Sequence, residues 1–207
     1  MGFENYKKSI YALTGIPGSG KSTVLSLFKD LGAFTCKADD LAKKAIIKGT
    51  HGYQLVVDNF GTEILDHNNQ IIRQKLGDIV FKSIEKRKLL ESIIHPIVAD
   101  YAFQEFNSDE AKAAAIKIYE IPLLFELQME KQFRKTIAVL ANENICIERI
   151  KLRDNCTKEQ AIAKIKSQLS LEAKAAKADY CIYNEGSIQD LKIKVKSLWI
   201  EIDNCHE

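Results

Sequence analysis

The residues at positions 15–22 have the types and spacing of a phosphate-binding loop, Gly-x-x-x-x-Gly-Lys-Ser. Glycines let the backbone fold around an anion, so that successive amides and the N-terminus of the next helix point at phosphate oxygens. Lys21 adds a mobile positive charge, and the hydroxyl of Ser22 is placed to ligate Mg²⁺. The pattern therefore predicts a nucleotide-binding site.

The sequence on either side of this loop supplies the elements that the motif needs. Residues 10–13 form an apolar run typical of a buried strand, and residues 23–28 carry apolar side chains at helical spacing. A loop between a strand and a helix is the setting in which this motif binds phosphate. The alternative is that a glycine- and serine-rich turn merely joins the strand to the helix.

An acidic residue, Asp39, follows the second predicted strand at residues 33–36. If the first two strands are neighbours in the sheet, Asp39 lies near the phosphate loop. A carboxylate there suits a general base in phosphoryl transfer, because it orients the acceptor hydroxyl and takes its proton. The alternative is a capping role, since aspartate is common at the start of a helix. Asp40 competes for that position and is the residue that we predict to be the cap.

Two predicted helices joined by a short turn have the organisation of a mobile lid. One ends at residue 154, and residues 155–160 begin the next, with Thr157 as a natural N-cap and Gln160 completing a capping box. Arg149 and Arg153 are four residues apart and share a helix face, where their guanidinium groups are placed to grip a triphosphate as the lid closes. The alternative is that both are solvated or paired surface residues.

A single histidine stands in a setting that favours a role at the acceptor. His95 precedes Pro96 between apolar residues, and no second histidine stands at ligand spacing. We predict that His95 forms hydrogen bonds and shapes the acceptor pocket, with a plain buried residue at a helix end as the alternative. The remaining histidines have no role in this interpretation: His51, His67 and His206.

The apolar segments alternate with helical patterns and predict the α/β fold class. Five of them have the character of strands, at residues 10–14, 33–36, 116–121, 136–140 and 180–183. Such alternation predicts a five-stranded parallel sheet flanked by helices on both faces, with ligands at the carboxyl ends of the strands.

The stretch at residues 41–114 breaks this alternation. Its helical patterns, at residues 41–47, 54–60, 73–81 and 89–106, come without a core strand. We therefore expect a helical insertion at residues 41–114 that packs on a core formed by residues 1–40 and 115–207, and the resemblance given below implies that this insertion binds the acceptor. The lid lies within that core, at about residues 146–170.

Composition excludes several classes of protein. No apolar run approaches the roughly 20 residues that span a bilayer, and the first residues lack the apolar stretch of a secretory signal, so we expect no membrane association and a cytoplasmic protein. The net charge is +2 with both signs interspersed, which indicates no nucleic-acid partner, and we assign the lysines from Lys82 to Lys88 to one solvated helix face.

The cysteines indicate neither a metal site nor a disulfide framework. They lie far apart and contain no Cys-x-x-Cys pair. We expect reduced structural thiols at Cys36, Cys146, Cys156, Cys181 and Cys205.

With these residues assembled, the chain resembles the dephospho-coenzyme A kinases, which phosphorylate the ribose 3′-hydroxyl of dephospho-coenzyme A in the last step of coenzyme A synthesis. The match runs nearly end to end, and its order is far more specific than the loop alone. It comprises residues 13–15 and 18–23, Ala38-Asp39 with Leu41-Ala42, Ile94-His95-Pro96, residues 121–126, Arg149, Arg153-Asp154, Gln168, Ala178-Asp179-Tyr180 and Asn184.

The resemblance implies a P-loop kinase core with a helical domain for the coenzyme A moiety and a lid. It implies ATP, Mg²⁺ and dephospho-coenzyme A as ligands, Asp39 as the base, and Lys21 and Arg149 as transition-state cations. The implied ATP-binding residues are Gly15, Gly18, Ser19, Gly20, Lys21, Ser22, Thr23, Arg153 and Asn184, with Mg²⁺ on Ser22. Those implied at the acceptor are Asp39, Lys43, His95, Pro122, Leu123, Leu124 and Phe125.

Three positions depart from the family pattern. Lys37 stands where the first acid of Asp-Ala-Asp is usual, which bears on Mg²⁺ or acceptor affinity, and Lys43 replaces an arginine, trading a bidentate fork for a point charge. The pair Ile16-Pro17 replaces Gly-Ile and keeps the loop length.

Two other functions share many of these features. A nucleoside or nucleotide kinase would share the loop, the sheet and the lid arginines, and an ATP-binding regulator without catalysis is an option raised by Lys37 and Lys43. The sequence is compatible with a monomer or a weak oligomer.

Overall fold

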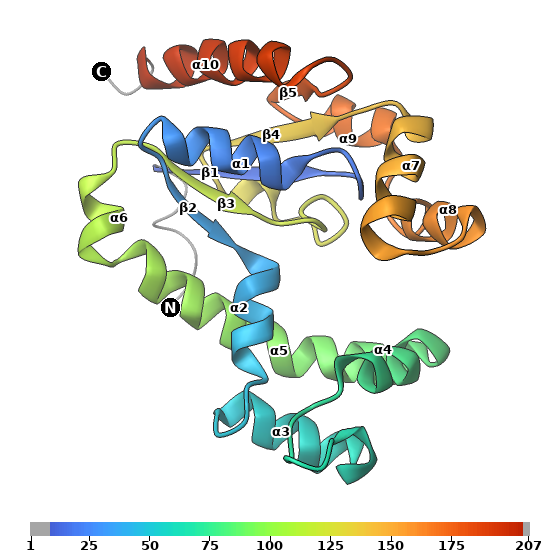
Figure 1. Ribbon diagram of the computed structural model, residues 1–207. Coiled ribbons are helices and arrows are strands. Elements are labelled where there is room, and N and C mark those ends of the chain that lie inside the picture. The colour runs from blue at the N-terminus through green and yellow to red at the C-terminus, as the bar shows by residue number, and fades with distance from the viewer. Residues whose placement is uncertain (1–8, 205–207) are drawn as a thin grey trace. The chain divides into compact units, whose positions relative to one another are not determined.

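The computed structural model describes residues 9–204, and its central element is a five-stranded parallel sheet with strand order β2-β3-β1-β4-β5 (Figure 1). Each strand agrees with its prediction to within one residue at either end, so the predicted sheet is confirmed. The strands are β1 (Ile10–Gly15), β2 (Phe34–Lys37), β3 (Lys117–Glu120), β4 (Lys135–Leu140) and β5 (Tyr180–Tyr183).

Strand β1 occupies the centre of the sheet, and all of its residues are buried. It pairs in parallel with β3 on one side and with β4 on the other, and β4 pairs in parallel with β5. A strand covered on both faces gains from a continuous apolar run, which is what the sequence of β1 provides. The register sets Gly15 beside Val139 of β4, so the chain leaves β1 at the carboxyl edge of the sheet.

The chain divides into two compact units. Within the described residues, the core unit combines residues 9–36 with residues 109–204, and the helical unit is Lys37–Ser108. The boundaries predicted from the sequence, after residues 40 and 114, fall a few residues further along the chain.

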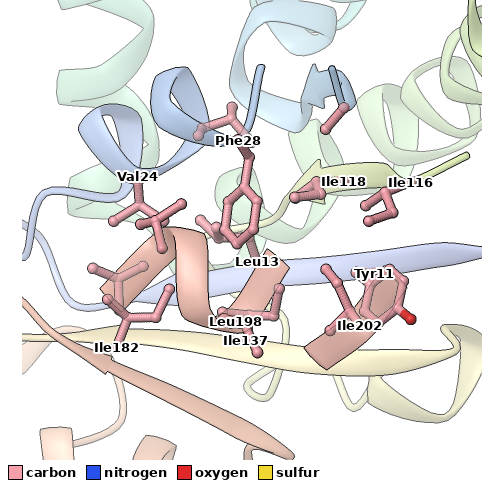
Figure 2. Packing of buried hydrophobic residues seen from close by; sticks show 14 of the residues in the cluster. Tyr11, Leu13, Val24, Phe28, Ile116, Ile118, Ile137, Ile182, Leu198 and Ile202 are labelled. Carbon is pink, nitrogen blue, oxygen red and sulfur yellow. The ribbon is translucent and has the colours of Figure 1, made fainter. Parts of the chain in front are cut away.

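One face of the sheet in the core unit is covered by α1 (Lys21–Asp30) and α10 (Ile188–Asn204). Figure 2 shows Phe28 of α1 directed at Leu13 of β1, with Leu198 and Ile202 of α10 in the same buried cluster. Burial of a large apolar side chain contributes about 1.5–3 kcal/mol. This cluster therefore fixes α1, and with it the end of the phosphate loop, on the sheet.

The remaining helices of the core unit include the two helices of the lid. The lid is formed by α7 and α8, which pack together with Ile16 of the phosphate loop through Cys146, Ile150 and Ile165. Helix α9 packs against β4 (Figure 1). The bounds are α6 (Asp109–Ala113), η3 (Glu130–Gln132), α7 (Glu143–Asp154), α8 (Lys158–Lys166) and α9 (Leu171–Lys177).

The helical unit has its own apolar core, formed by Val56, Phe60, Ile64 and Leu76. All four helical patterns predicted here are helices, each within about five residues of its predicted bounds. They are α2 (Ala38–Ala45), α3 (His51–Phe60), α4 (Arg73–Lys82) and α5 (Ile84–Phe106), with a short η2 (Thr62–Ile64) between α3 and α4.

The prediction that the lysines from Lys82 to Lys88 share one helix face is wrong. Lys82 is the last residue of α4, and Ser83 caps a new helix, α5, by accepting a hydrogen bond from the amide of Lys86 at 3.2 Å. The serine favours a helix start over helix continuation, because its side chain satisfies one of the amides left unpaired there.

No helix within residues 9–204 combines the length and the apolar content needed to cross a membrane.

Four cysteines in the described part of the chain, Cys36, Cys146, Cys156 and Cys181, are free, as predicted. Residues 9–204 also contain no cluster of His, Cys, Asp and Glu suited to a metal ion. Cys205 and His206 lie outside the described residues.

Candidate active site

The phosphate loop has a backbone conformation that requires glycine. Gly15, Gly18 and Gly20 have φ angles of 153°, 78° and 92°, a region that other residues rarely adopt. A Cβ atom on Gly15 would collide with the carbonyl oxygen of Val139, and one on Gly18 would lie 2.6 Å from the carbonyl oxygen of Cys146. The glycines therefore permit both the turn and its close packing against β4 and α7.

Two side chains predicted to bind ATP lie outside the phosphate loop and donate hydrogen bonds to its backbone carbonyls. The amide of Asn184, just after β5, donates from Nδ2 to the carbonyl of Ser19 at 2.8 Å in a buried position. Arg149 of α7 donates from Nη1 to the carbonyl of Gly18 and from Nη2 to the carbonyl of Asn184, both at 3.3 Å. The structure thus brings Arg149 and Asn184 together at the loop.

Helix α1 begins directly after the loop, with Gly20 as its N-cap and no side-chain cap. The first amides of a helix have no intrahelical partner and carry its positive end, which favours an anion. Lys21 donates from Nζ to the carbonyls of Gly15 at 3.0 Å and Ile16 at 3.2 Å, so its ammonium lies against the loop. Ser22 and Thr23 follow in the exposed first turn.

The two lid arginines, one helical turn apart, have different partners. Arg153 donates from Nε and Nη2 to the carboxylate of Asp154, at 2.6 and 3.1 Å, and Lys164 of α8 donates to the same carboxylate at 2.5 Å. The hydrogen bonds from Arg153 and then Lys164 hold the pKa of Asp154 well below its usual value. Arg153 is therefore held within the lid, whereas Arg149 contacts the loop.

The joint between the two lid helices is the one that the sequence predicts. Thr157 accepts from the amide of Gln160 at 3.3 Å, and the Gln160 side chain accepts from the amide of Thr157 at 2.9 Å. This reciprocal pair is a capping box, and it confirms the predicted start of α8.

The loop after β3, residues 121–128, carries the predicted acceptor residues of the core unit. Leu124 and Phe125 are buried, with 0% and 2% of their surface exposed, so their side chains pack inside the unit. Leu123 is 38% exposed, and Pro122 is partly exposed. Pro122 and Leu123 are therefore the members of this set whose side chains reach the surface.

A cavity of about 450 Å³ opens beside the phosphate loop within the core unit. Its wall includes Ile16 of the loop, Asn142 at the start of α7, Gln168 and Ser170 between α8 and α9, and Glu185 after β5. The cavity is thus bounded by the loop, the lid and the segment that connects the lid to α9.

Asp39 belongs to the helical unit, where β2 continues directly into α2. Lys37 occupies the N-cap position, and Asp39 and Asp40 both fall in the first turn, so the prediction that Asp40 caps the helix is wrong. The reason is that the helix starts without an intervening turn. Acidic residues in a first turn still stabilise the positive helix end.

The assumption that β1 and β2 are neighbours is also wrong, because β3 lies between them. Two strand spacings separate β2 from β1, which is about 10 Å. The pairing depends on β3, which enters the sheet some 80 residues after β2, and a local pattern does not reveal it. Adjacency to the loop therefore gives no support to Asp39 as a base, and that role stays a prediction.

The two other acceptor residues of the helical unit are exposed. Lys43 donates to the carboxylate of Asp40 at 2.7 Å, and this hydrogen bond lowers the pKa of Asp40. His95 is exposed in the middle of α5, followed by Pro96 inside the same helix. The alternative, a buried histidine at a helix end, is therefore wrong. The role of His95 at the acceptor stays a prediction.

Comparison with known proteins identifies the family. The family model described as Dephospho-CoA kinase matches residues 9–190. The chain belongs to the dephospho-CoA kinase family. A dephospho-CoA kinase of Oryza sativa subsp. japonica is 38% identical over 189 residues, covering 91% of this chain and 82% of that protein.

Solved structures agree with this assignment. A dephospho-CoA kinase from Campylobacter jejuni has a TM-score of 0.70 at 28% identity and covers 96% of this chain and 98% of that one. The crystal structure of TT1252 from Thermus thermophilus has a TM-score of 0.81 at 29% identity, with coverage of 93% and 97%. The predicted P-loop kinase fold is confirmed.

Two buried charged residues of this dephospho-CoA kinase family member were not singled out as site residues from the sequence. Glu120, 9% exposed, ends β3 and pairs in register with Leu13 of β1, two residues before Gly15. Lys174 of α9 has no exposed surface, and its Nζ lies 3.0 Å from Oε1 of Glu126. An acid that ends an apolar strand is a signal available in the sequence, whereas nothing in the helical pattern of α9 distinguishes the buried Lys174 from Lys177.

The donor set at the loop fits a hard cation. Mg²⁺ prefers oxygen ligands and keeps several waters, so it needs one or two protein groups beside the phosphates. Ser22 offers a hydroxyl in the exposed first turn of α1, and Glu120 offers a carboxylate at the same edge of the sheet. These two residues would hold Mg²⁺ here.

Proposed function

We propose that the protein transfers the γ-phosphoryl group of Mg-ATP to the ribose 3′-hydroxyl of dephospho-CoA through the residues described above. The hydroxyl oxygen forms a bond to the γ-phosphorus, and the bond to the β-γ bridging oxygen breaks. The products are coenzyme A and ADP, and the hydroxyl proton passes to a carboxylate. Family membership supports the reaction, and the observation that carries the residue assignment is the contact of Arg149 and Asn184 with the phosphate loop.

The loop and its cations stabilise the charge that spreads over the transferring oxygens. Backbone amides and the first turn of α1 bind the phosphates, while Lys21 and Arg149 supply two positive side chains fixed at the same loop. Preorganised groups of this kind need little rearrangement as charge develops, which makes them effective. Bound Mg²⁺, on Ser22 and Glu120, would neutralise phosphate charge.

Asp39 is the proposed general base. Its carboxylate is exposed in the first turn of α2, so it is accessible to a substrate hydroxyl. Its counterpart in chain position is the acid of the family's Asp-Ala-Asp motif, which in this chain is Lys37-Ala38-Asp39. The loss of the first acid leaves Asp39 as the carboxylate of that motif.

The lid excludes water from the reacting phosphate. Arg149 lies on the lid helix α7 and contacts the loop, so movement of α7 changes its approach to the nucleotide. We propose that Arg153 reaches the triphosphate only after it leaves Asp154, to which it is hydrogen-bonded within the lid.

Incubation of the protein with Mg-ATP and dephospho-CoA tests this function directly. Mass spectrometry of the product should show one added phosphate on the acceptor, with ADP formed in equal amount. A panel of adenosine, AMP and a small sugar alcohol in place of dephospho-CoA separates this activity from that of another small-molecule kinase. Phosphorylation of a panel member and not of dephospho-CoA would overturn the proposal.

The Lys21→Ala variant provides the control for contaminating kinase activity. Its product formation should fall by about 10³-fold, because the ammonium on the loop is lost. A preparation in which wild type and variant give equal product would show that the activity does not belong to this chain.

A further inference from the structure

An ion pair joins the fully buried Lys174 to the partly exposed Glu126 of the loop after β3. Lys174 has no exposed surface, and its Nζ is 3.0 Å from Oε1 and 3.2 Å from Oε2 of Glu126. The same ammonium donates to the carbonyl of Pro122 at 2.9 Å. Lysine is almost never fully buried unless it is paired. Here one carboxylate and one carbonyl match its three donors.

The two acceptors of Lys174 are also bound to segments on either side. The carbonyl of Pro122 accepts a second hydrogen bond, from Oγ1 of Thr14 at 3.1 Å, and Thr14 is the residue before Gly15 of the phosphate loop. The carboxylate of Glu126 accepts a second hydrogen bond, from the amide of Leu169 at 2.8 Å. One continuous set of contacts therefore joins the end of β1, the loop after β3 and the connection between α8 and α9.

The connection between α8 and α9, residues 167–170, is where the lid returns to the sheet. Gln168 and Ser170 in this connection form part of the wall of the cavity beside the phosphate loop. The contact between Leu169 and Glu126 therefore fixes one wall of the cavity and the loop that carries Pro122 and Leu123 in a single arrangement.

A buried charge pair is a poor way to add stability. Desolvation of both charges opposes their attraction, and an apolar pair of similar volume is often equally stable or more so. What the pair provides is directional hydrogen bonding. The ammonium fixes the position of the Pro122 carbonyl, and the carboxylate fixes that of the Leu169 amide. Packing alone would let the loop after β3 and the lid connection settle independently.

We propose that Lys174 and Glu126 are positioning residues that tie the lid connection to the acceptor side of the site. This inference rests on the proposed function in so far as Pro122 and Leu123 border the acceptor. The pair acts through these neighbours and touches neither substrate. Its loss leaves the phosphate loop able to bind nucleotide, but the acceptor loop and the lid connection no longer move as one.

The test uses three variants of the full-length protein: Lys174→Met, Glu126→Gln and the double variant Lys174→Met/Glu126→Leu. In the double variant both charges are replaced by apolar groups, so no unpaired charge stays buried and the fold should survive. We expect the double variant to raise KM for dephospho-CoA about tenfold and to lower kcat. Its affinity for an ATP analogue should stay within about twofold of the wild type.

A matched control removes another lysine–carboxylate pair of the same unit. Lys135, at the start of β4, lies 2.8 Å from Asp179, half exposed and at the opposite end of the strand from the phosphate loop. The Lys135→Met variant should leave KM and kcat for both substrates unchanged. This control shows how far KM and kcat change when an ion pair is lost that does not link the lid connection to the loop after β3.

Hydrogen exchange at the amide of Leu169 gives a readout that does not depend on the acceptor. Exchange should quicken in all three variants and not in Lys135→Met, because only the former disturb the acceptor of that amide. If the wild type makes no product from dephospho-CoA while this exchange pattern holds, the proposed function fails and the coupling stands.

Two outcomes would overturn the inference. One is a folded double variant with KM, kcat and Leu169 exchange like the wild type. The other is failure of all three variants to fold, which would make the pair a folding requirement with no separate positioning role.

Discussion

The phosphate loop and the first turn of α2 are proposed to carry the two halves of the chemistry, and they differ in how firmly their side chains are held. At the loop, Asn184 is buried and hydrogen-bonded, and Arg149 makes two contacts with backbone carbonyls. In α2, Asp39 is exposed, and the neighbouring Asp40 pairs with Lys43 at the surface.

The difference teaches which substitutions separate activity from stability. A side chain that belongs to a buried hydrogen-bond network stabilises the fold and also positions the ligand. Its removal therefore changes both stability and activity. An exposed group contributes little to the folded state, where surface substitutions are usually within about 0.5 kcal/mol. A substitution that affects the phosphate loop should therefore change both activity and stability, whereas a substitution in the first turn of α2 should change mainly activity.

The largest expected effect on activity is that of Lys21→Ala. Removal of a preorganised charge at the transferring phosphate lowers kcat by about 10³-fold. Lys21 also holds the carbonyls of Gly15 and Ile16, so the melting temperature should change as well. Steady-state kinetics with dephospho-CoA and a thermal melt measure the two effects. A Lys21→Ala variant with the wild-type kcat would show that the Lys21 ammonium of the loop does not stabilise the transition state.

Asp39→Asn should separate activity from stability most cleanly. Loss of a general base lowers kcat by about 10²–10⁴-fold. The melting temperature should fall only slightly, because the side chain is exposed and stabilises the fold only through its charge at the start of α2. Single-turnover phosphorylation, which excludes product release, measures the chemical step. Asp40→Asn, next in the chain and paired with Lys43, is the control and should keep the rate. Near-normal turnover by Asp39→Asn would refute the base.

Arg149 and Arg153 repeat the comparison within one helix. Arg149→Ala should lower kcat by about 10²-fold and also destabilise the loop, because two carbonyls lose their donor. Arg153→Ala should have a smaller effect on kcat, about tenfold, because Arg153 is hydrogen-bonded to Asp154 and we propose that it reaches the nucleotide only after release. ATP-analogue affinity measured beside kcat tells binding from catalysis. Equal losses in the two variants would contradict the different roles.

The sequence predicts those parts of the molecule that local pattern determines. The strands, the capping box of α8 and the glycine loop follow from apolar runs, turn chemistry and spacing, and all three are confirmed. The insertion of β3 between β1 and β2 depends on long-range pairing and was missed. The burial of Lys174 depends on a carboxylate 48 residues away, which no helical pattern reveals.

The smallest expected effect is on the pH dependence of stability, and it concerns the Asp154 carboxylate of the lid. Hydrogen bonds from Arg153 and then Lys164 lower the pKa of Asp154 in the folded state. A carboxyl group with a lowered pKa stabilises the fold above its unfolded pKa of about 3.9, and this contribution is lost as the pH falls toward the folded value. Asp154→Asn should therefore be less stable than the wild type near pH 6, with the gap narrowing as the pH approaches about 3.

Urea unfolding of both proteins at the two pH values measures this gap, which should not exceed about 1 kcal/mol for a pair at the surface. Because the other carboxylates are common to both proteins, their titration cancels in the difference. A gap that stays constant with pH would mean that the Asp154 carboxylate adds nothing to the lid through its charge. Release of Arg153 from Asp154 would then cost the lid no charge-dependent stability, and the pairing with Asp154 would not account for a smaller effect of Arg153→Ala.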